Sequence, residues 1–568
     1  MPPADPATPF GLFITLGLLV LFYGGTFLMS ARIGHRQENA DSYMNAGHGV
    51  GFGISAASMT ATWIWASSMY ASVTSGYTYG ISGPIHYGLW GALMILFIYP
   101  FGRRIRKVAP RAHTLAEVMH ARHGRSSQLM LAGSNVVGSV ISLMSNLIAG
   151  GALISMLSPF GFVQGVLCIA AGVLLYTLWS GFRASVLTDF AQVVAMLGAV
   201  VLILPALFFS LGGPALFAEG ARNLTPQQGD FFSSEAFLNQ GAPYIAAVLA
   251  YAIGNQTIAQ RLFAVREDLI KPTFITATVG YGATIIGIGM IGVLALYAGI
   301  EPAGGDPNNL LPQIAAGHLP GVLLAVFFVM IIGSLSSTAD SDLSALSSIA
   351  MADVYGRGVR RSGRAADPRT MLLVGRLTMV LATATAVVLA SLQLSILDLL
   401  VFVGALWGAL VFPVIASFYW VKVTNAAFTV SVLAALAAFL PVRFGAVPDT
   451  GPLPLLAELL AVLGVGVVLG LMVFGFAGTR PALVVGALSA LAAAPFVLGF
   501  LRDYEALTGS LVAYAVSTVV CWAMSVRSTT DFDFAEIRRR TGDFTAETGP
   551  EPDPVRDDLA RAAGRDER

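Results

Sequence analysis

The sequence predicts an all-α integral membrane protein in which about fifteen transmembrane helices contain two inverted five-helix halves. Of the 568 residues, 56% are hydrophobic and only 11% are charged, whereas a soluble domain carries about a quarter charged residues. Apolar stretches of about 20 residues, enough to cross a hydrocarbon core of ~30 Å, recur along the chain. Polar islands open the second and the seventh stretch, five spans apart. Discontinuous helices at matching positions of two halves are typical of transporters built from inverted repeats.

The individual spans follow from the apolar stretches. The first one follows "MPPADPATPF", which lacks the basic region of a signal peptide, so we expect it to remain as a membrane helix. The stretch at 425–440 is the shortest. The expected spans are 9–30, 49–72, 80–102, 126–157, 159–180, 185–211, 241–264, 273–299, 320–354, 370–391, 395–420, 425–440, 454–476, 480–500 and 508–526.

The basic residues predict the orientation, because Lys and Arg favour cytoplasmic loops. With the N-terminus outside, the inward loops contain "ARIGHR", "RRIRKVAPRAH", "QRLFAVREDLIK" and "GRGVRRSGR". The exceptions that fall outside are Arg222, Arg443 and Arg502. The sequence therefore predicts an N-out, C-in, multi-pass protein of the inner or plasma membrane.

These spans divide the chain into six regions. The segment after Val526 is highly charged and poor in apolar residues, so we expect a largely disordered cytoplasmic tail. The outward loop before the seventh span is longer than a connection needs and can fold over the extracellular mouth. The regions are 1–48 with an extra helix and a cytoplasmic loop, 49–211 with the first five-helix repeat, 212–240 with the extracellular loop, 241–420 with the second five-helix repeat, 421–526 with additional helices, and the tail 527–568.

Composition and motifs exclude several classes of function. The chain has 32 basic and 32 acidic residues, which gives no indication of a nucleic-acid partner. It lacks the G-x-x-x-x-G-K-[ST] pattern that holds nucleotide phosphates. We therefore expect neither an enzyme nor an ATP-driven pump, and no cofactor. The expected partners are the lipid bilayer, a small solute and a coupling cation.

The ninth span changes from the apolar "GVLLAVFFVMII" to "GSLSSTADSDLSALSS" with no loop signal between them. At 100° per residue its hydroxyls share about a third of the helix circumference, which helix packing alone would explain. A charged Asp at mid-bilayer costs roughly 2.5–3.5 kcal/mol, so Asp340 and Asp342 favour a functional site. Because the span is longer than the hydrocarbon core requires, Asp342 can instead reach the inner interface and be solvated.

Other polar residues interrupt the apolar spans. "AASMTATWIWASSMYAS" lies in the second span, and "YAIGNQTIAQR" lies in the seventh, where Asn255 and Gln256 either bond a polar solute or are satisfied core amides. Asp189, just inside the sixth span, is either a functional carboxylate or the partner of Arg183. Two adjacent hydroxyls and the carbonyls freed by a broken helix suit Na⁺, because hard cations prefer oxygen ligands. A carboxylate nearby can add a second cation site or take up a proton.

Several motifs resemble the sodium:solute symporter family. "SGFRASVLTDFAQ" and "SSTADSDLSALSSIAMADVYGR" are similar to two of its signatures, and "ADSYMNAGHGVG" resembles the entry to its first core helix. The resemblance covers roughly residues 30–420 and implies the LeuT-type 5+5 inverted-repeat fold. "TWIWASSMYASVTSGYTYGISGPIHYG" and "AHTLAEVMHARHG" look most like the urea active transporter branch. Asp342 stands where other members often have Gln.

The resemblance also implies the binding residues. The shared sodium site would use the hydroxyls of Ser337 and Thr338 and the backbone carbonyls of Ala61, Ile64 and Ser334. A second cation or proton site would use Asp189, Asp340 and Ser341. Asn255 matches a substrate-contacting asparagine, and the other expected solute-binding residues lie on helices that line the cavity of the family. The full set is Asn255, Gln256, Trp63, Trp65, Ser68, His86 and Trp407.

The expected function is secondary active symport of a small polar solute, urea or a similar neutral amide, driven by Na⁺. Na⁺- or H⁺-coupled transport of a monocarboxylate or an amino acid is the alternative. No intramembrane Lys or Arg presents itself as a carboxylate partner, although helix N-termini can substitute. A non-transporting solute sensor is an alternative of another class, but the tail of about 40 residues is too short for a signalling kinase. A passive channel is the third, and it would not accumulate solute uphill.

Overall fold

The computed structural model describes residues 9–34, 40–360 and 364–542, which are helical apart from turns, loops and one isolated bridge between Val50 and Val265. Fourteen helices among these residues are long and apolar enough to cross a membrane. One further crossing is made by α3 (Phe52–Trp63) and α4 (Ala66–Tyr79), two shorter helices that follow one another across a break. The prediction of an all-α membrane protein with about fifteen spans is confirmed.

The first repeat opens with the broken helix α3/α4 and closes with a kinked one. α9 (Phe162–Ser210) contains two of the predicted spans, joined at Gly181, where φ is +55°. A positive φ favours glycine, which has no Cβ to clash with the backbone. The other helices of this part and of the N-terminal region are α1 (Leu12–Gly34), α2 (Ala40–Asn45), α5 (Ser82–Leu96), α6 (Ile98–Val108), α7 (Leu115–His123) and α8 (Arg125–Leu157).

The second repeat opens in the same way. Its first crossing is broken at Asn255, between α13 (Ala242–Gly254) and α14 (Gln256–Ala264). The two breaks occupy corresponding positions in the two halves, as in transporters with inverted repeats. The following elements are α15 (Ile270–Tyr297), α16 (Leu310–His318), α17 (Gly321–Ser348), the π-helical η7 (Ile349–Gly356), α18 (Arg357–Arg360), α19 (Pro368–Ala390) and α20 (Ile396–Tyr419).

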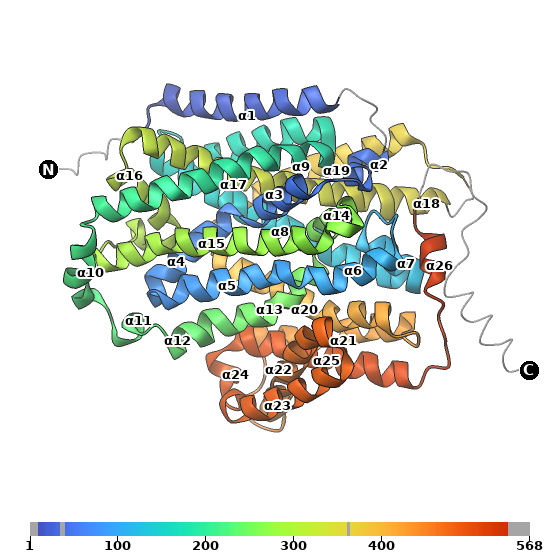
Figure 1. The fold of residues 1–568 in the computed structure, drawn as a ribbon. Coiled ribbons are helices and arrows are strands. Elements are labelled where there is room, and N and C mark those ends of the chain that lie inside the picture. Colours follow the sequence, from blue (N-terminus) through green and yellow to red (C-terminus); the bar gives the residue numbers. More distant parts are fainter. Residues whose placement is uncertain (1–8, 35–39, 361–363, 543–568) are drawn as a thin grey trace, which may run out of the picture.

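Additional helices flank the two repeats (Figure 1). α1 lies along one edge of the bundle and packs on α9, and the C-terminal helices lie along the opposite edge, where α25 contacts α20, α21 and α22. The helices on that edge are α21 (Asn425–Arg443), α22 (Leu453–Ala477), α23 (Thr479–Val497), α24 (Phe500–Asp503) and α25 (Glu505–Val526). The last helix, α26 (Ala535–Arg540), lies apart from them at the end of the bundle, beside α7.

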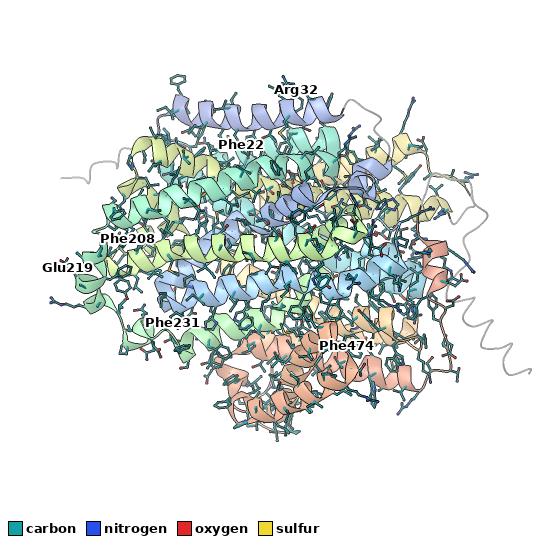
Figure 2. All side chains as sticks on the ribbon, viewed as in Figure 1. Phe22, Arg32, Phe208, Glu219, Phe231 and Phe474 are labelled. Carbon is teal, nitrogen blue, oxygen red and sulfur yellow. The ribbon has the colours of Figure 1, made fainter. Side chains whose placement is uncertain are left out.

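The loop between the repeats is folded against the helix bundle. It contains α10 (Pro214–Gly220), α11 (Pro226–Gly229) and α12 (Ser234–Ala236), at the end of the bundle where Figure 2 shows Glu219 and Phe231. The Gln228 side chain donates from Nε2 to the backbone carbonyl of Thr78 at 3.1 Å. The loop is thereby tied to the end of α4, on the side that the basic residues predict to be extracellular.

At the opposite end, α7 joins elements of both repeats. The backbone N–H of Leu115 donates to Gln256 Oε1 at 3.0 Å, and Thr114 Oγ1 donates to Asp353 at 2.7 Å. The His123 ring lies 2.6 Å from the hydroxyl of Ser417. α7 therefore holds the predicted cytoplasmic ends of α14, η7 and α20 together.

The start of the C-terminal tail is ordered, which corrects the expectation of disorder for residues 527–542. Ile537 in α26 is fully buried, and the Arg122 guanidinium lies 4.0 Å from the centre of the Phe532 ring. The backbone N–H of Gly542 donates to Glu117 Oε1 at 3.0 Å. A few apolar and aromatic side chains thus fix this charged segment onto α7. Residues 543–568 lie outside the described part of the chain.

Acidification is expected to destabilise the contact between α7 and α20. Burial, and then the charge of Arg122, lower the pKa of His123 well below its usual value. The unfolded chain therefore binds more protons than the folded one below about pH 6.5, and the stability contributed by the neutral ring is lost as pH falls further. Thermal unfolding in detergent should show a decreasing midpoint between pH 7 and pH 5, with a weaker decrease in His123→Gln. Equal slopes in the two proteins would contradict this assignment.

Candidate ion and solute sites

The predicted sodium site lies where α17 passes the break between α3 and α4. Ile64 has ψ of 75° and leaves the helical conformation, so the carbonyls of the last turn of α3 are no longer all used by the helix. Thr338 Oγ1 donates to the carbonyl of Thr62 at 3.1 Å, and Ser334 Oγ donates to the carbonyl of Ile64. Ala61 is buried in the same turn of α3. Hydroxyl and carbonyl oxygens therefore converge at the break, which is the ligand set that Na⁺ prefers.

Asp189 links this site to a buried arginine that the sequence assigns to a cytoplasmic loop. Ser337 Oγ donates to Asp189 Oδ1, and the other carboxylate oxygen forms an ion pair with Arg261 Nη2 at 3.0 Å. Arg261 lies in α14 with its side chain 4% exposed. The sequence offers Arg183 as an alternative partner of Asp189, whereas the structure pairs Asp189 with Arg261, across the two repeats.

The guanidinium also occupies the predicted second cation site. Arg261 Nη2 donates to Ser341 Oγ at 2.7 Å, and Nε donates to Ser58 Oγ at 3.1 Å. Ser58 in turn donates to Asp189 at 2.6 Å. The protein thus supplies a cation of its own among the oxygens of this cluster, so a second Na⁺ would have to displace or share these contacts.

Asp340 and Asp342 accept hydrogen bonds from different helices. Tyr176 donates to Asp340 at 2.8 Å and Ser185 donates at 2.6 Å, so this carboxylate joins α17 to both parts of α9. Asp342 is 2% exposed and accepts from Ser142 in α8 at 2.6 Å. The expectation that Asp342 is solvated at the inner interface is therefore corrected: α17 continues beyond it as η7 and α18, which keeps it inside the protein.

A small cavity lies between the two broken helices, next to the sodium site. It leaves about 20 Å³ for the centres of water-sized molecules, against the roughly 10–15 Å³ that one water requires. Trp63 and Trp65 contact Tyr251 with ring centroids 5.8 and 6.3 Å apart. The lining is uncharged and rich in aromatic rings, and consists of Trp63, Trp65, Ser68, Tyr87, Gly91, Met94, Tyr244, Tyr251 and Tyr281.

Two tryptophans of this lining differ in their hydrogen bonds. Trp63 Nε1 donates to the carbonyl of Gly91 at 3.1 Å. Trp65 Nε1 is buried and has no acceptor among the described residues. A buried donor without a partner is costly, and a solute carbonyl in the cavity would satisfy it.

Four of the predicted solute residues have other roles. Asn255 Oδ1 accepts from the backbone N–H of Thr257 at 2.8 Å and caps α14. Gln256 holds α7, and His86 accepts from Trp90 Nε1 at 3.2 Å beside Phe237. Trp407 packs behind Tyr251, 5.0 Å between ring centroids, and donates to the carbonyl of Ser134. The structure places Trp63, Trp65 and Ser68 of the predicted set at the cavity.

The tyrosines of the cavity are not in the sequence-predicted set. Tyr87 follows His86 directly, and Tyr251 lies one turn before Asn255 in the polar island of the seventh span. This proximity is the signal that could have indicated them. Tyr244 and Tyr281 lie in apolar stretches that carry no such signal.

The structure is that of a multi-pass membrane protein with two broken helices and an aromatic cavity between them. The model of the Sodium:solute symporter family matches residues 43–433. The chain belongs to this family.

Its relatives include transporters of several solutes. The chain is 23% identical over 387 residues to the "Probable urea active transporter 1" of Schizosaccharomyces pombe, covering 63% of this chain and 58% of the relative. It is 24% identical over 430 residues to a urea-proton symporter of Oryza sativa subsp. japonica, covering 68% and 58%. It is also 24% identical over 408 residues to the high-affinity proline transporter of Bacillus subtilis, covering 69% and 84%. The chain thus spans little more than half the length of the urea transporters it matches.

Solved structures show the same fold. A substrate-bound, outward-open, Na⁺-coupled sialic acid symporter superimposes with a TM-score of 0.64 at 19% identity, covering 84% of this chain and 98% of that one. The predicted LeuT-type fold is confirmed.

Proposed function

We propose that this protein is a Na⁺-coupled symporter of urea or a similar small neutral amide. The observation that carries the proposal is the uncharged, aromatic cavity with the buried Trp65 N–H, next to the oxygen cluster at the break of α3/α4. Urea offers a carbonyl acceptor and needs no counter-ion. A carboxylate would enter the cavity without a facing cation among its lining residues. The named activity of several relatives supports the same solute.

Ion coupling follows from the position of the two sites. Na⁺ held by Ser337, Thr338 and the carbonyls of α3 would fix the broken helix that also carries Trp63 and Trp65. Binding of the ion and of the solute would therefore each favour the other, and this effect is reciprocal. The two repeats would then open the cavity to the other side of the membrane.

Uptake into proteoliposomes tests the proposal. Urea, acetate, pyruvate, proline and a sugar are supplied in parallel, with a Na⁺ gradient and a pH gradient imposed separately. We expect uphill accumulation of urea driven by Na⁺. Uptake driven only by pH would make the proton the coupling ion, and uptake of proline alone would reassign the solute. No uphill accumulation of any solute would contradict symport and favour a sensor or a channel.

Trp65→Phe is expected to weaken solute binding while the protein still folds. The substitution keeps an aromatic ring in the cavity and removes the N–H group, so the loss should be one hydrogen bond, worth about 0.5–1.5 kcal/mol. We expect the KM for urea to rise about three- to tenfold, with the Na⁺ dependence retained. Trp179→Phe is the matched control, because Trp179 is exposed on the outside of the bundle. Equal KM values in both variants would contradict a role for the Trp65 N–H.

A further inference from the structure

A second, larger cleft lies at the predicted cytoplasmic side, away from the solute cavity. Its volume is about 880 Å³, and its walls come from α6, from the turn η4 (Glu267–Leu269) and from the last turn of α22. α22 lies beyond the part of the chain that the family model matches. The cleft is therefore formed by the family core together with an additional helix.

One wall of the cleft is basic. Arg103 and Lys107 are exposed and lie four residues apart on α6, so their side chains share one face of that helix. Arg104 beside them is held in place, because its Nε donates to the carbonyl of Phe418 at 3.0 Å. Three cations thus face one space, an arrangement that suits a phosphate group.

The opposite wall is acidic. Glu267 and Asp268 are exposed at the cleft, and Asp268 forms an ion pair with Arg266 at 2.8 Å. Glu267 is the carboxylate that this neighbour does not neutralise. The cleft therefore presents cations and a carboxylate to one ligand, which is the pattern that a group carrying both a phosphate and an ammonium would match.

The third wall is apolar and ends at an exposed aromatic ring. Phe476, 54% exposed in the last turn of α22, packs against Phe97 and Tyr99 with ring centroids 5.4 and 6.5 Å apart. Phe474, labelled in Figure 2, stacks on Phe101 at 6.4 Å and fixes α22 against α6. Aromatic rings beside basic residues are typical of the membrane–water interface.

We propose that this cleft binds the headgroup of a zwitterionic aminophospholipid, phosphatidylethanolamine, from the cytoplasmic leaflet. The phosphate lies between Arg103, Arg104 and Lys107, and the ammonium group donates to Glu267. The acyl chains pass Phe476 into the bilayer. Phosphatidylglycerol lacks the ammonium group that Glu267 accepts from, and free phosphate lacks the apolar part.

Native mass spectrometry of the full-length protein tests the assignment. The protein is extracted from nanodiscs that contain equal amounts of phosphatidylethanolamine, phosphatidylglycerol and phosphatidylcholine, and the retained lipid is identified. We expect preferential retention of phosphatidylethanolamine, reduced at least fivefold by the double substitution Arg103→Gln and Lys107→Gln. Glu267→Gln should remove the preference over phosphatidylglycerol while a lipid is still retained. Arg369→Gln, an exposed arginine at the start of α19, is the control and should change neither result.

Three outcomes would overturn the proposal. These are equal retention of the three lipids by the unmodified protein, unchanged retention in the double variant, and displacement of the lipid by inorganic phosphate alone. Lipid retention is measured without transport, so the result does not depend on which solute the protein carries.

Discussion

Replacing Arg261 with glutamine is expected to lower the unfolding temperature and to abolish coupled uptake. The Arg261 guanidinium donates hydrogen bonds to Asp189 and Ser341, and all three side chains are almost completely buried. Removing one partner of a buried pair leaves an uncompensated charge, which typically costs about 3–5 kcal/mol. Asp189 would also lose the contact that orients it toward Ser337. Thermal unfolding in detergent and urea uptake in proteoliposomes measure the two effects.

The charge itself can be separated from the packing of the side chain. Combining Arg261→Gln with Asp189→Asn removes both charges. We therefore expect the double variant to recover much of the unfolding temperature that Arg261→Gln alone loses. Arg266→Gln is the matched control, because its pair with Asp268 is 57% and 60% exposed and such pairs contribute about 0–1 kcal/mol. If Arg261→Gln were as stable and as active as Arg266→Gln, the buried pair would have no structural or functional role.

Removing the hydroxyl of Ser337 or Thr338 is expected to raise the apparent KM for Na⁺ about tenfold or more. The Thr338 hydroxyl lies at the break of α3/α4 and the adjacent Ser337 hydroxyl bonds Asp189, and both would coordinate the ion together with backbone carbonyls. Ser337→Ala should have the larger effect, because that hydroxyl also bonds Asp189. The order of preference among solutes should stay the same, since neither residue lines the cavity.

Ser344→Ala is the control for this series. Ser344 lies on the same helix and is equally buried, and its hydroxyl has no partner among the described residues. Initial rates of uptake against Na⁺ concentration give the comparison. Unchanged apparent Na⁺ affinity in both Ser337→Ala and Thr338→Ala would remove the proposed sodium site.

The fold was predictable because the membrane imposes strong patterns on composition. Apolar stretches located the spans, and hydroxyl-rich interruptions located the breaks in α3/α4 and the polar part of α17. These features are local in sequence. The family resemblance implied that Ser334 and Thr338 would contact the broken helix, and both donate to backbone carbonyls at its break.

The parts of the site that the sequence does not predict depend on where a helix starts and on which way a side chain points, and composition does not determine either. Arg261 belongs both to the expected seventh span 241–264 and to the inward loop "QRLFAVREDLIK", and the sequence does not show that the break at Asn255 lets α14 start inside the protein and bury it. Tyrosines in an apolar span can face lipid, a neighbouring helix or a cavity, and the sequence does not distinguish these. The side chains of Asn255 and Gln256 accept hydrogen bonds from backbone N–H groups at the starts of α14 and α7. Their polarity therefore has a structural explanation.

The contact between Gly542 and Glu117 joins residues that are 425 positions apart in the chain. Because synthesis proceeds from the N-terminus, α7 and both repeats are inserted before the segment that holds them at this end has been made. The contact between this segment and α7 can therefore form only after the helices of both repeats have been synthesised. A product that stops after α25 would contain every membrane crossing among the described residues and would lack this contact with α7.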